Sequence, residues 1–280
     1  MTRRSLLSTA AATAAASLVL PSAAPAGELK GKIRKCLKWG MVKDQSLPLP
    51  EAFRKLKACG YEGVEPSFKQ VKDADAWLAA SKETGMVIDC VVGAGENDLN
   101  PVVDLAKKLG GDSILVTARY DQKKSWWDNW KETQAQIKAA GPYGEKQGIK
   151  ILIENVWASF LISPLDMQRF VDEIAHPWVG VHYDVGNVMR WGVAEHWIQV
   201  LGKRIGKLDI KEYSLPVAMK EGMAAGFKNP IGEGSVNWPA VREELVKLGF
   251  SGWAAAEVAG GDWEYLADVA RRMDTVLGLA

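Results

Sequence analysis

Short runs of apolar residues alternate along this chain with longer segments in which apolar positions recur at helical spacing. The short runs have the length and the residue types of strands buried in a sheet, and the longer segments have ordinary helix lengths. The predicted strands occupy residues 37–42, 63–66, 87–92, 113–118, 151–155, 179–185, 205–211 and 253–258. The predicted helices occupy residues 50–59, 74–84, 101–109, 130–146, 164–174, 194–201, 238–248 and 262–277.

This alternation repeats as eight strand-then-helix units. Proline stands near the first turn of several predicted helices and glycine follows the ends of most of them, which supports the boundaries. Eight such units in about 245 residues match the size of a (β/α)8 barrel. A doubly wound open sheet is the alternative, but no G-x-G-x-x-G motif follows the first strand to indicate a dinucleotide site. We therefore predict an α/β protein with a single (β/α)8 TIM barrel in residues 27–280.

Residues 1–26 have the features of a twin-arginine signal peptide. Arg3 and Arg4 precede an alanine-rich stretch, and the segment ends in an A-x-A cleavage pattern at residues 24–26. The apolar run at 6–20 is shorter than the ~20 residues of a membrane-spanning helix, so we expect no span in the mature protein. The expected location is the periplasm. Twin-arginine export carries folded proteins, often with a cofactor already bound.

Composition and charge narrow the possible partners. The chain has 280 residues, 48% of them hydrophobic and 25% charged, as in ordinary globular proteins. Without residues 1–26, 33 basic side chains face 34 acidic ones, and a net charge of −1 gives no indication of a nucleic-acid or membrane partner. The three cysteines, Cys36, Cys59 and Cys90, are interpreted as buried apolar residues, with one disulfide left open. The oligomeric state is also open, a homodimer being one option.

Four carboxylates end predicted strands in the second half of the chain. Each is the last inward-facing residue of an apolar run: Glu154, Asp184, Asp209 and Glu257. Chemistry in a TIM barrel takes place at the carboxyl ends of the strands, and these four strands are neighbours. Four converging carboxylates raise one another's pKa values unless a cation neutralises them. The pattern predicts a divalent metal site, with Mg²⁺ or Mn²⁺ favoured by oxygen ligands, and Zn²⁺ or Co²⁺ if a histidine joins.

Other residues are candidates for substrate binding. His182 shares the inward face of Asp184 one layer deeper, where it either reaches the metal or substrate or is a hydrogen-bonded core residue. Lys211 lies near the mouth and is a candidate partner for a substrate oxygen or a phosphate. Among 12 tryptophans, Trp39 and Trp157 are the expected pocket walls, because an indole ring suits the C–H face of a sugar. Two long loops, 118–129 and 213–229, are candidate lids.

Several segments of the chain resemble one known family. "ILIENVW", "VHYDVGNVMRWG", "KLDIKEYS" and "NPIGEGSVNWPAVREELVKLGFSGWAAAEV" are similar to the xylose isomerase-like TIM barrels of the sugar phosphate isomerase/epimerase group. That group includes hydroxypyruvate isomerase, ketose 3-epimerases and inosose dehydratase. The resemblance covers most of residues 33–280, and the segment 231–257 is its most specific part.

The resemblance implies a function as well as a fold. Family members bind a divalent metal through Glu, Asp, His and Glu, which correspond here to Glu154, Asp184, Asp209 and Glu257. Asp209 departs from the pattern, since the usual residue is histidine, and an extra carboxylate favours a hard ion. The implied activity is a metal-dependent sugar isomerase or epimerase that uses an enediolate intermediate. Glu154 and Glu257 would be the catalytic acid and base.

Two other functions stay open at this point. A lyase or dehydratase acting on a keto-sugar or cyclitol would use the same chemistry, and a barrel without catalytic activity would bind carbohydrate only. A DNA endonuclease of the same superfold is disfavoured, because its multi-metal site needs several histidines and a basic face and the chain has three histidines. We expect a small carbohydrate as the substrate. The export signal favours a free sugar, a sugar acid or a cyclitol over a phosphorylated sugar, because phosphorylated sugars are mainly cytoplasmic.

Overall fold

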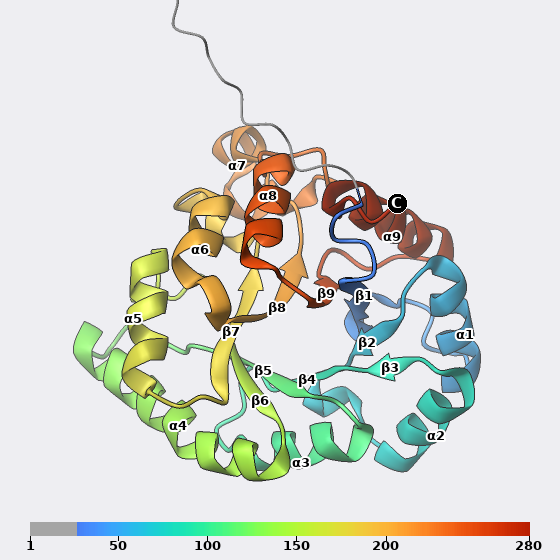
Figure 1. Ribbon diagram of the computed structural model, residues 1–280, viewed down its shortest axis with the longest axis horizontal. Helices are drawn as coiled ribbons and strands as arrows, with labels where there is room; N and C mark the ends of the chain where they lie inside the picture. The colour runs from blue at the N-terminus through green and yellow to red at the C-terminus, as the bar shows by residue number, and fades with distance from the viewer. Residues whose placement is uncertain (1–26) are drawn as a thin grey trace, which may run out of the picture.

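The computed structural model describes residues 27–280, so the predicted signal peptide at 1–26 lies outside the described residues. Nine parallel strands form one sheet that curls around the centre of the molecule, with the helices outside it (Figure 1). The strands are β1 (Ile33–Lys38), β2 (Gly63–Glu65), β3 (Val87–Ile88), β4 (Cys90–Val92), β5 (Ser113–Thr117), β6 (Lys150–Glu154), β7 (Val179–Asp184), β8 (Ile205–Ile210) and β9 (Gly252–Ala256). The predicted TIM barrel is confirmed.

The sheet closes through a strand that is broken in the middle. Its order is β3-β2-β1-β9-β8-β7-β6-β5-β4, and the two outer members, β3 and β4, are separated in the chain by Asp89 alone. Ser67 and Val92 add a parallel bridge between the segments that follow β2 and end β4. The nine strands therefore represent the eight predicted units, with the single strand predicted at 87–92 divided in two at Asp89.

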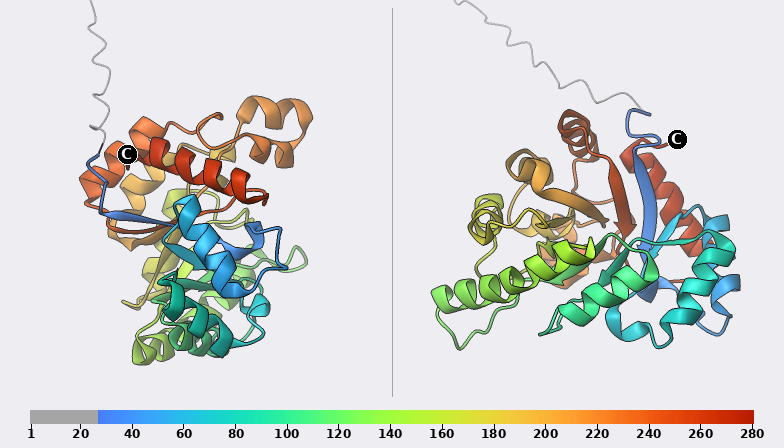
Figure 2. Two further views of the ribbon diagram at one scale, coloured as in Figure 1. Left: turned by 90° about the vertical axis from the view of Figure 1, so that its right-hand side faces the viewer. Right: turned by 60° about the horizontal axis from the view of Figure 1, so that its bottom comes forward.

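A ring of helices covers the outside of the barrel, as Figure 2 shows from two further directions. They are α1 (Leu49–Cys59), α2 (Ala74–Thr84), α3 (Asn100–Leu109), α4 (Trp126–Gln147), α5 (Pro164–Ile174), α6 (Ala194–Leu201), α7 (Leu215–Glu221), α8 (Trp238–Leu248) and α9 (Trp263–Leu277). Four of them, α2, α5, α6 and α8, have the predicted boundaries. Within residues 27–280, none of the helices has both the length and the apolar character needed to cross a bilayer.

The first strand differs from its prediction. We predicted residues 37–42, but β1 spans Ile33–Lys38, and Trp39–Met41 form a 3₁₀ turn. Basic residues interrupt the apolar run of β1, so the strand cannot be recognised from apolar runs alone. The Arg34 guanidinium pairs with Glu62 at 3.0 Å, and the Lys35 ammonium lies 2.7 Å from Asp274, so each charge has an acidic partner while the strand stays in the sheet.

The two predicted lid loops contain helix. Ser125 caps α4 by accepting a hydrogen bond from the Asp128 amide, so this helix begins at Trp126, inside the loop predicted at 118–129. The loop predicted at 213–229 contains α7 and the 3₁₀ segment Met223–Lys228. A backbone hydrogen bond of 2.8 Å from Ser214 to Gly226 joins the two ends of this segment. The segment forms the orange coil that projects beyond the barrel in the left view of Figure 2.

The two ends of the described chain meet on one side of the barrel. The amide of Gly27 donates a 2.9 Å hydrogen bond to the carbonyl of Gly278, just past the end of α9. Gly27 precedes β1, and Gly278 ends the last helix, so this junction lies at the amino ends of the strands. That face is opposite to the carboxyl ends of the strands, where the four predicted carboxylates stand.

Candidate metal centre at the carboxyl ends of the strands

Four carboxylates from four neighbouring strands converge at one end of the barrel. Glu154 and Asp184 are the last residues of β6 and β7, Asp209 is the last but one of β8, and Glu257 directly follows β9. Asp184 and Asp209 are partners in the sheet register, which keeps them at one level. One ligand oxygen from each of the four lies within 4.8 Å of the others, and only Glu257 is partly exposed. We call these four residues the mouth cluster.

Two asparagines hold the mouth cluster in place. The side chain of Asn155 bonds both backbone groups of Asp184, at 2.7 and 2.8 Å, and so joins the ends of β6 and β7. Asn187 donates from its side chain to Glu154 at 3.1 Å and from its backbone amide to Asp184 at 2.9 Å. These bonds fix the positions of two carboxylates before any ligand binds.

Two lysines supply positive charge to the mouth cluster. The Lys211 ammonium lies 2.8 Å from Asp184 and also contacts Glu257. The Lys38 ammonium lies 2.8 Å from Asp209 and 2.5 Å from Glu65, a further buried acid at the end of β2. Lys38 therefore divides its charge between the mouth cluster and a deeper acid. Among the described residues, Lys211 pairs with carboxylates of the mouth cluster alone, whereas Lys38 is shared between the mouth cluster and Glu65.

The shortage of positive charge appears in the pKa values of the carboxylates. Burial, reinforced by the charge of Glu257, raises the pKa of Glu154 well above its usual range. Burial also raises the pKa of Asp184 to about 7 and that of Asp209 to about 6, against the opposing effects of Lys211 and Lys38. For Glu257 the two lysines outweigh burial and lower the pKa to about 2. The site therefore holds more carboxylates than its own cations stabilise in the charged form.

The residues present fit a divalent cation. The second oxygen of Asp209, Oδ2, is buried and has no hydrogen-bond donor among residues 27–280. The available donors are carboxylate oxygens, which hard ions such as Mg²⁺ and Mn²⁺ prefer. A bound cation would relieve the repulsion that raises the carboxylate pKa values.

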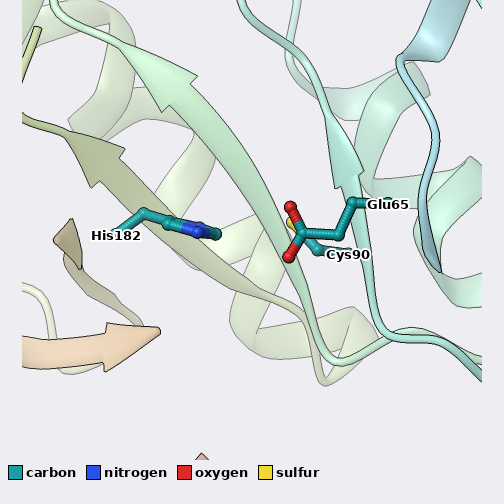
Figure 3. Close-up of side chains that lie close together, drawn as sticks. All are labelled: Glu65, Cys90 and His182. Atoms are coloured by element: carbon teal, nitrogen blue, oxygen red, sulfur yellow. The ribbon is translucent and has the colours of Figure 1, made fainter. Parts of the chain in front are cut away.

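A second group of polar residues lies deeper in the barrel. We call this group the inner cluster; its members are Cys36, Glu65, Asp89, Cys90, His182 and Lys207. Figure 3 shows Glu65 and Cys90 close together, with the ring of His182 opposite them. The Lys207 ammonium lies 2.7 Å from Asp89 and 2.8 Å from Asp112. Cys36 and Cys90 therefore lie among charged groups, although all three described cysteines are free.

His182 links the inner cluster to the mouth cluster. Its Nε2 lies 3.0 Å from Asp209 Oδ1, and its side chain has no exposed surface. Burial, together with the nearby Lys38 ammonium, lowers the pKa of His182 to about 3, so the ring is neutral and donates this hydrogen bond to the carboxylate. The predicted position one layer below Asp184 is therefore correct. His182 faces Asp209, as expected of the hydrogen-bonded core residue that was the alternative to a contact with metal or substrate.

The two tryptophans predicted as pocket walls lie in different surroundings. Trp157 is partly exposed near the mouth cluster and donates a 2.8 Å hydrogen bond to the Asn187 carbonyl. Trp39 packs edge-on against Phe53 of α1 and Trp77 of α2, with ring centroids 6.0 and 5.2 Å away. Those contacts account for the burial of Trp39, which is 6% exposed, so its place is in the helix-packing core.

Three residues that the sequence analysis did not select contribute to the site. Glu65 ends a short apolar strand, the same signal that identified the mouth cluster, and could have been found in that way. Lys38 ends β1, but the predicted strand began at residue 37 and placed Lys38 at the wrong end. Asn187 has no comparable signal, because its role depends on the 3₁₀ turn that follows β7.

Glu212, which follows β8, is a buried acid with a different role. It accepts hydrogen bonds from the amides of Tyr213, Gly232 and Val236 and from the indole of Trp238, at 2.8 to 3.1 Å. A Cβ on Gly234 would lie 2.4 Å from Glu212 Oε1, so this turn passes directly over the carboxylate. The G-E-G turn of the sequence is thus folded around one fully bonded carboxylate.

Comparisons with known proteins agree with this architecture. A family model described as xylose isomerase-like TIM barrel matches residues 53–274. A curated protein of Escherichia coli (strain K12), whose name L-ribulose-5-phosphate 3-epimerase SgbU is itself provisional, is 24% identical over 243 residues, covering 74% of this chain and 82% of that protein.

Three solved structures illustrate the shared fold. The 3-keto-D-glucoside 4-epimerase YcjR from E. coli superposes with a TM-score of 0.71 at 15% identity, covering 88% of this chain and 98% of that one. A D-psicose 3-epimerase, solved with D-fructose, gives a TM-score of 0.71 at 14% identity, with 88% and 99% coverage. A xylose isomerase-like TIM barrel protein from Mycobacterium smegmatis, in complex with magnesium, superposes with a TM-score of 0.67 at 16% identity, covering 89% of this chain and 98% of that one. At these identities the likeness concerns the fold alone.

Proposed function

The chain belongs to the xylose isomerase-like TIM barrel family, and on this premise we propose that it is a divalent-metal-dependent isomerase or epimerase of a sugar or sugar derivative. The observation that carries the proposal is the convergence of Glu154, Asp184, Asp209 and Glu257 within 4.8 Å at the catalytic end of the barrel. The names of the curated relative and of two structural neighbours, all sugar epimerases, support the substrate class.

The four carboxylates of the mouth cluster would hold the metal, with Mg²⁺ or Mn²⁺ favoured by their oxygens. A magnesium ion in one structural neighbour supports this choice. When bound, such a cation polarises a substrate carbonyl and acidifies the adjacent C–H bond. His182 and Lys38 keep Asp209 oriented through its Oδ1, which leaves Oδ2 as the oxygen available to a ligand.

Glu154 and Glu257 are the proposed pair for proton transfer. Their pKa values are displaced in opposite directions, that of Glu154 well above the usual range and that of Glu257 down to about 2. These displacements describe the metal-free site, and a cation held by both carboxylates would lower the pKa of Glu154 as well. The pairing therefore rests on the common place of the two carboxylates in the mouth cluster. Glu257 would accept a proton from the carbon next to the carbonyl, and Glu154 would donate one. Return to the opposite face of that carbon gives an epimer, and return to the neighbouring carbon exchanges aldose and ketose.

Two further side chains are placed to orient the sugar. Lys211 contacts Asp184 and Glu257, and its ammonium would donate to a substrate oxygen if those carboxylates held a metal. The indole of Trp157, fixed by its bond to Asn187, offers an apolar face suited to the C–H groups of a sugar. We propose both as substrate-binding residues.

A solvent-exchange experiment tests this function. Purified protein with Mn²⁺ or Mg²⁺ would be incubated in D₂O with a panel of ketoses, and NMR would follow deuterium entry and new isomers. We expect deuterium at C3 or at the carbon exchanged between aldose and ketose. A chelator and Glu154→Gln should each abolish the exchange. The exposed Glu264, which has no bonded side-chain partner among residues 27–280, provides the matched control Glu264→Gln. Absence of exchange in every sugar would contradict the proposal.

We also propose that the protein is exported to the periplasm, on the evidence of Arg3, Arg4 and the A-x-A pattern in the sequence. Cell fractionation tests this location. Replacement of Arg3 and Arg4 by lysine should retain the protein in the cytoplasm, whereas an unchanged distribution would contradict twin-arginine export.

A further inference from the structure

Arg190 lies between two tryptophans, Trp157 and Trp191, and follows Asn187 by three residues. It ends the 3₁₀ turn Asn187–Arg190 that follows β7, one turn after the asparagine that bonds Glu154 and Asp184. Its guanidinium carbon is 4.4 Å from the ring centroid of Trp157 and 4.0 Å from that of Trp191. Stacking of this kind fixes the plane of a guanidinium while leaving its N–H edge available.

The guanidinium of Arg190 has no polar partner within residues 27–280. Its Nε is buried and receives no hydrogen-bond acceptor, although the residue keeps part of its surface exposed. Each of the other described arginines donates to a side chain or a carbonyl, and these are Arg34, Arg54, Arg119, Arg169, Arg204, Arg242, Arg271 and Arg272. Within the described residues, Arg190 is thus an oriented donor without an acceptor.

The other two arginine–tryptophan stacks among the described residues differ from that of Arg190 because each arginine has an acidic partner. Arg34 lies 4.0 Å from the Trp253 ring and pairs with Glu62 at 3.0 Å. Arg169 lies 5.7 Å from the Trp130 ring and pairs with Glu173 at 2.6 Å. In both cases a glutamate satisfies the guanidinium edge, as expected for a structural stack. Arg190 has two indoles and no glutamate.

The position of Arg190 relates it to the proposed substrate site. Trp157 contacts Arg190 with its ring and also packs against Phe227, at a centroid distance of 5.3 Å. The ring of Phe227 in turn lies 5.4 Å from the ammonium of Lys211, which contacts two carboxylates of the mouth cluster. A sugar that reached the mouth cluster past Trp157 would therefore bring its distal end toward Arg190.

We propose that Arg190 binds an oxyanion, a carboxylate or a phosphate, carried by the sugar substrate at the end away from the reacting carbons. The guanidinium fork matches the two oxygens of either group, and the two indoles fix its orientation. This inference rests on the proposed sugar site and assigns to it an anionic sugar. Arg190 is a specificity-determining residue in this assignment and takes no part in proton transfer.

Calorimetric titration with matched sugars tests the assignment without requiring turnover. L-Ribulose and L-ribulose 5-phosphate differ by a phosphate, and D-fructose and D-fructuronate differ by a carboxylate. In Mg²⁺, wild-type protein should bind at least one anionic sugar more tightly than its neutral partner. Arg190→Gln should weaken binding of the anionic sugar about tenfold to a hundredfold, as loss of a charge-assisted hydrogen bond does. The affinity for the neutral sugars should change less than about twofold. The pair that shows the effect identifies phosphate or carboxylate as the group.

Two further variants separate a binding role from a structural one. Arg190→Lys keeps the charge but loses the fork, so it should recover part of the affinity. Arg34→Gln alters an arginine–tryptophan stack away from the mouth, and it should leave the affinities for the neutral and the anionic sugar unchanged. If no anionic sugar is preferred, or if Arg190→Gln weakens neutral and anionic sugars equally, the inference is overturned. Anion-selective binding without any deuterium exchange would overturn the proposed isomerase function and leave this inference standing.

Discussion

The mouth cluster and the inner cluster both bury carboxylates inside the barrel, but they differ in the number of lysines that pair with those carboxylates. In the inner cluster Glu65 and Asp89 each have a lysine, at 2.5 and 2.7 Å. In the mouth cluster four carboxylates have Lys211 and a share of Lys38. Burial still raises the pKa of Asp89 to about 7 beside Lys207. The four carboxylates of the mouth cluster have fewer lysines for their number, and protonation or an added cation would stabilise them.

We expect the mouth cluster to serve ligand binding and the inner cluster to serve the fold. Two sets of inner residues, Glu65 with Cys90 and His182 and Cys36 with Glu65 and Asp89, also bring ligand atoms within 4.8 Å of one another. The inner cluster is deep in the barrel, and its lysine, Lys207, also bonds the Asp89 carbonyl and Asp112. The mouth cluster stands at the strand ends, and Glu257 is partly exposed. The predictions below test whether changes in one cluster affect activity and changes in the other affect stability.

Glu154→Gln should have the largest effect on activity and little cost in stability. The substitution removes a carboxyl whose pKa is raised by burial, so the metal-free protein should melt at the same or a higher temperature. Turnover should fall by about 10²–10⁴-fold, the usual contribution of a general acid or base. Activity assays and thermal melts with and without Mn²⁺ check both parts. If Glu154→Gln lost stability but kept its activity, Glu154 would have a structural role like that expected for the inner cluster.

Lys207→Met should show the opposite pattern. Asp89 would keep its buried position without its lysine, and loss of one member of a buried ion pair costs about 3–5 kcal/mol. Chemical denaturation measures this loss. The exposed Lys203 gives the matched control Lys203→Met, for which we expect almost no change. Metal affinity of the folded fraction should be unaltered, and a selective loss of metal binding would contradict the separation of the clusters.

Glu212→Gln tests a third way of burying a carboxylate, by hydrogen bonds alone. Each oxygen of Glu212 accepts from two N–H donors, so either orientation of a glutamine places its NH₂ group against donors. We expect a loss of about 1–3 kcal/mol, measured by denaturation. Glu243, which pairs only with Lys247 on the outside of α8, provides the control Glu243→Gln. Equal effects of the two variants would contradict the role given to Glu212.

The smallest predicted effect is a change in metal preference in Asp209→His, which concerns the identity of the metal. A histidine replaces an oxygen ligand by nitrogen, which favours Zn²⁺ or Co²⁺ over Mg²⁺ or Mn²⁺. We expect a shift of about tenfold in the relative concentrations of Zn²⁺ and Mg²⁺ that stabilise the protein, measured by thermal shift. Asp209→Asn, which keeps oxygen as a ligand, should weaken both metals without changing their order. An unchanged order in Asp209→His would mean that Asp209 does not contact the metal.

The mouth cluster could be predicted from the sequence because of a simple physical signal. A carboxylate at the end of an apolar run is costly to bury, and in a barrel four consecutive run ends meet. Lys38 gave no such signal, because the basic residues of β1 hide the strand that ends with it. Arg190 was beyond the reach of periodicity altogether, since its stack joins a turn after β7 to a tryptophan after β6.

The bond between Gly27 and Gly278 has a practical consequence for handling the protein. Both ends of the described chain emerge together at the amino ends of the strands, so a tag, a surface anchor or a fusion partner attached at either end would stand clear of the mouth. A short linker between the two ends would also permit a circular permutant, with new ends cut in an exposed loop. Such a permutant would allow the mouth cluster to be studied with the original ends of the chain closed.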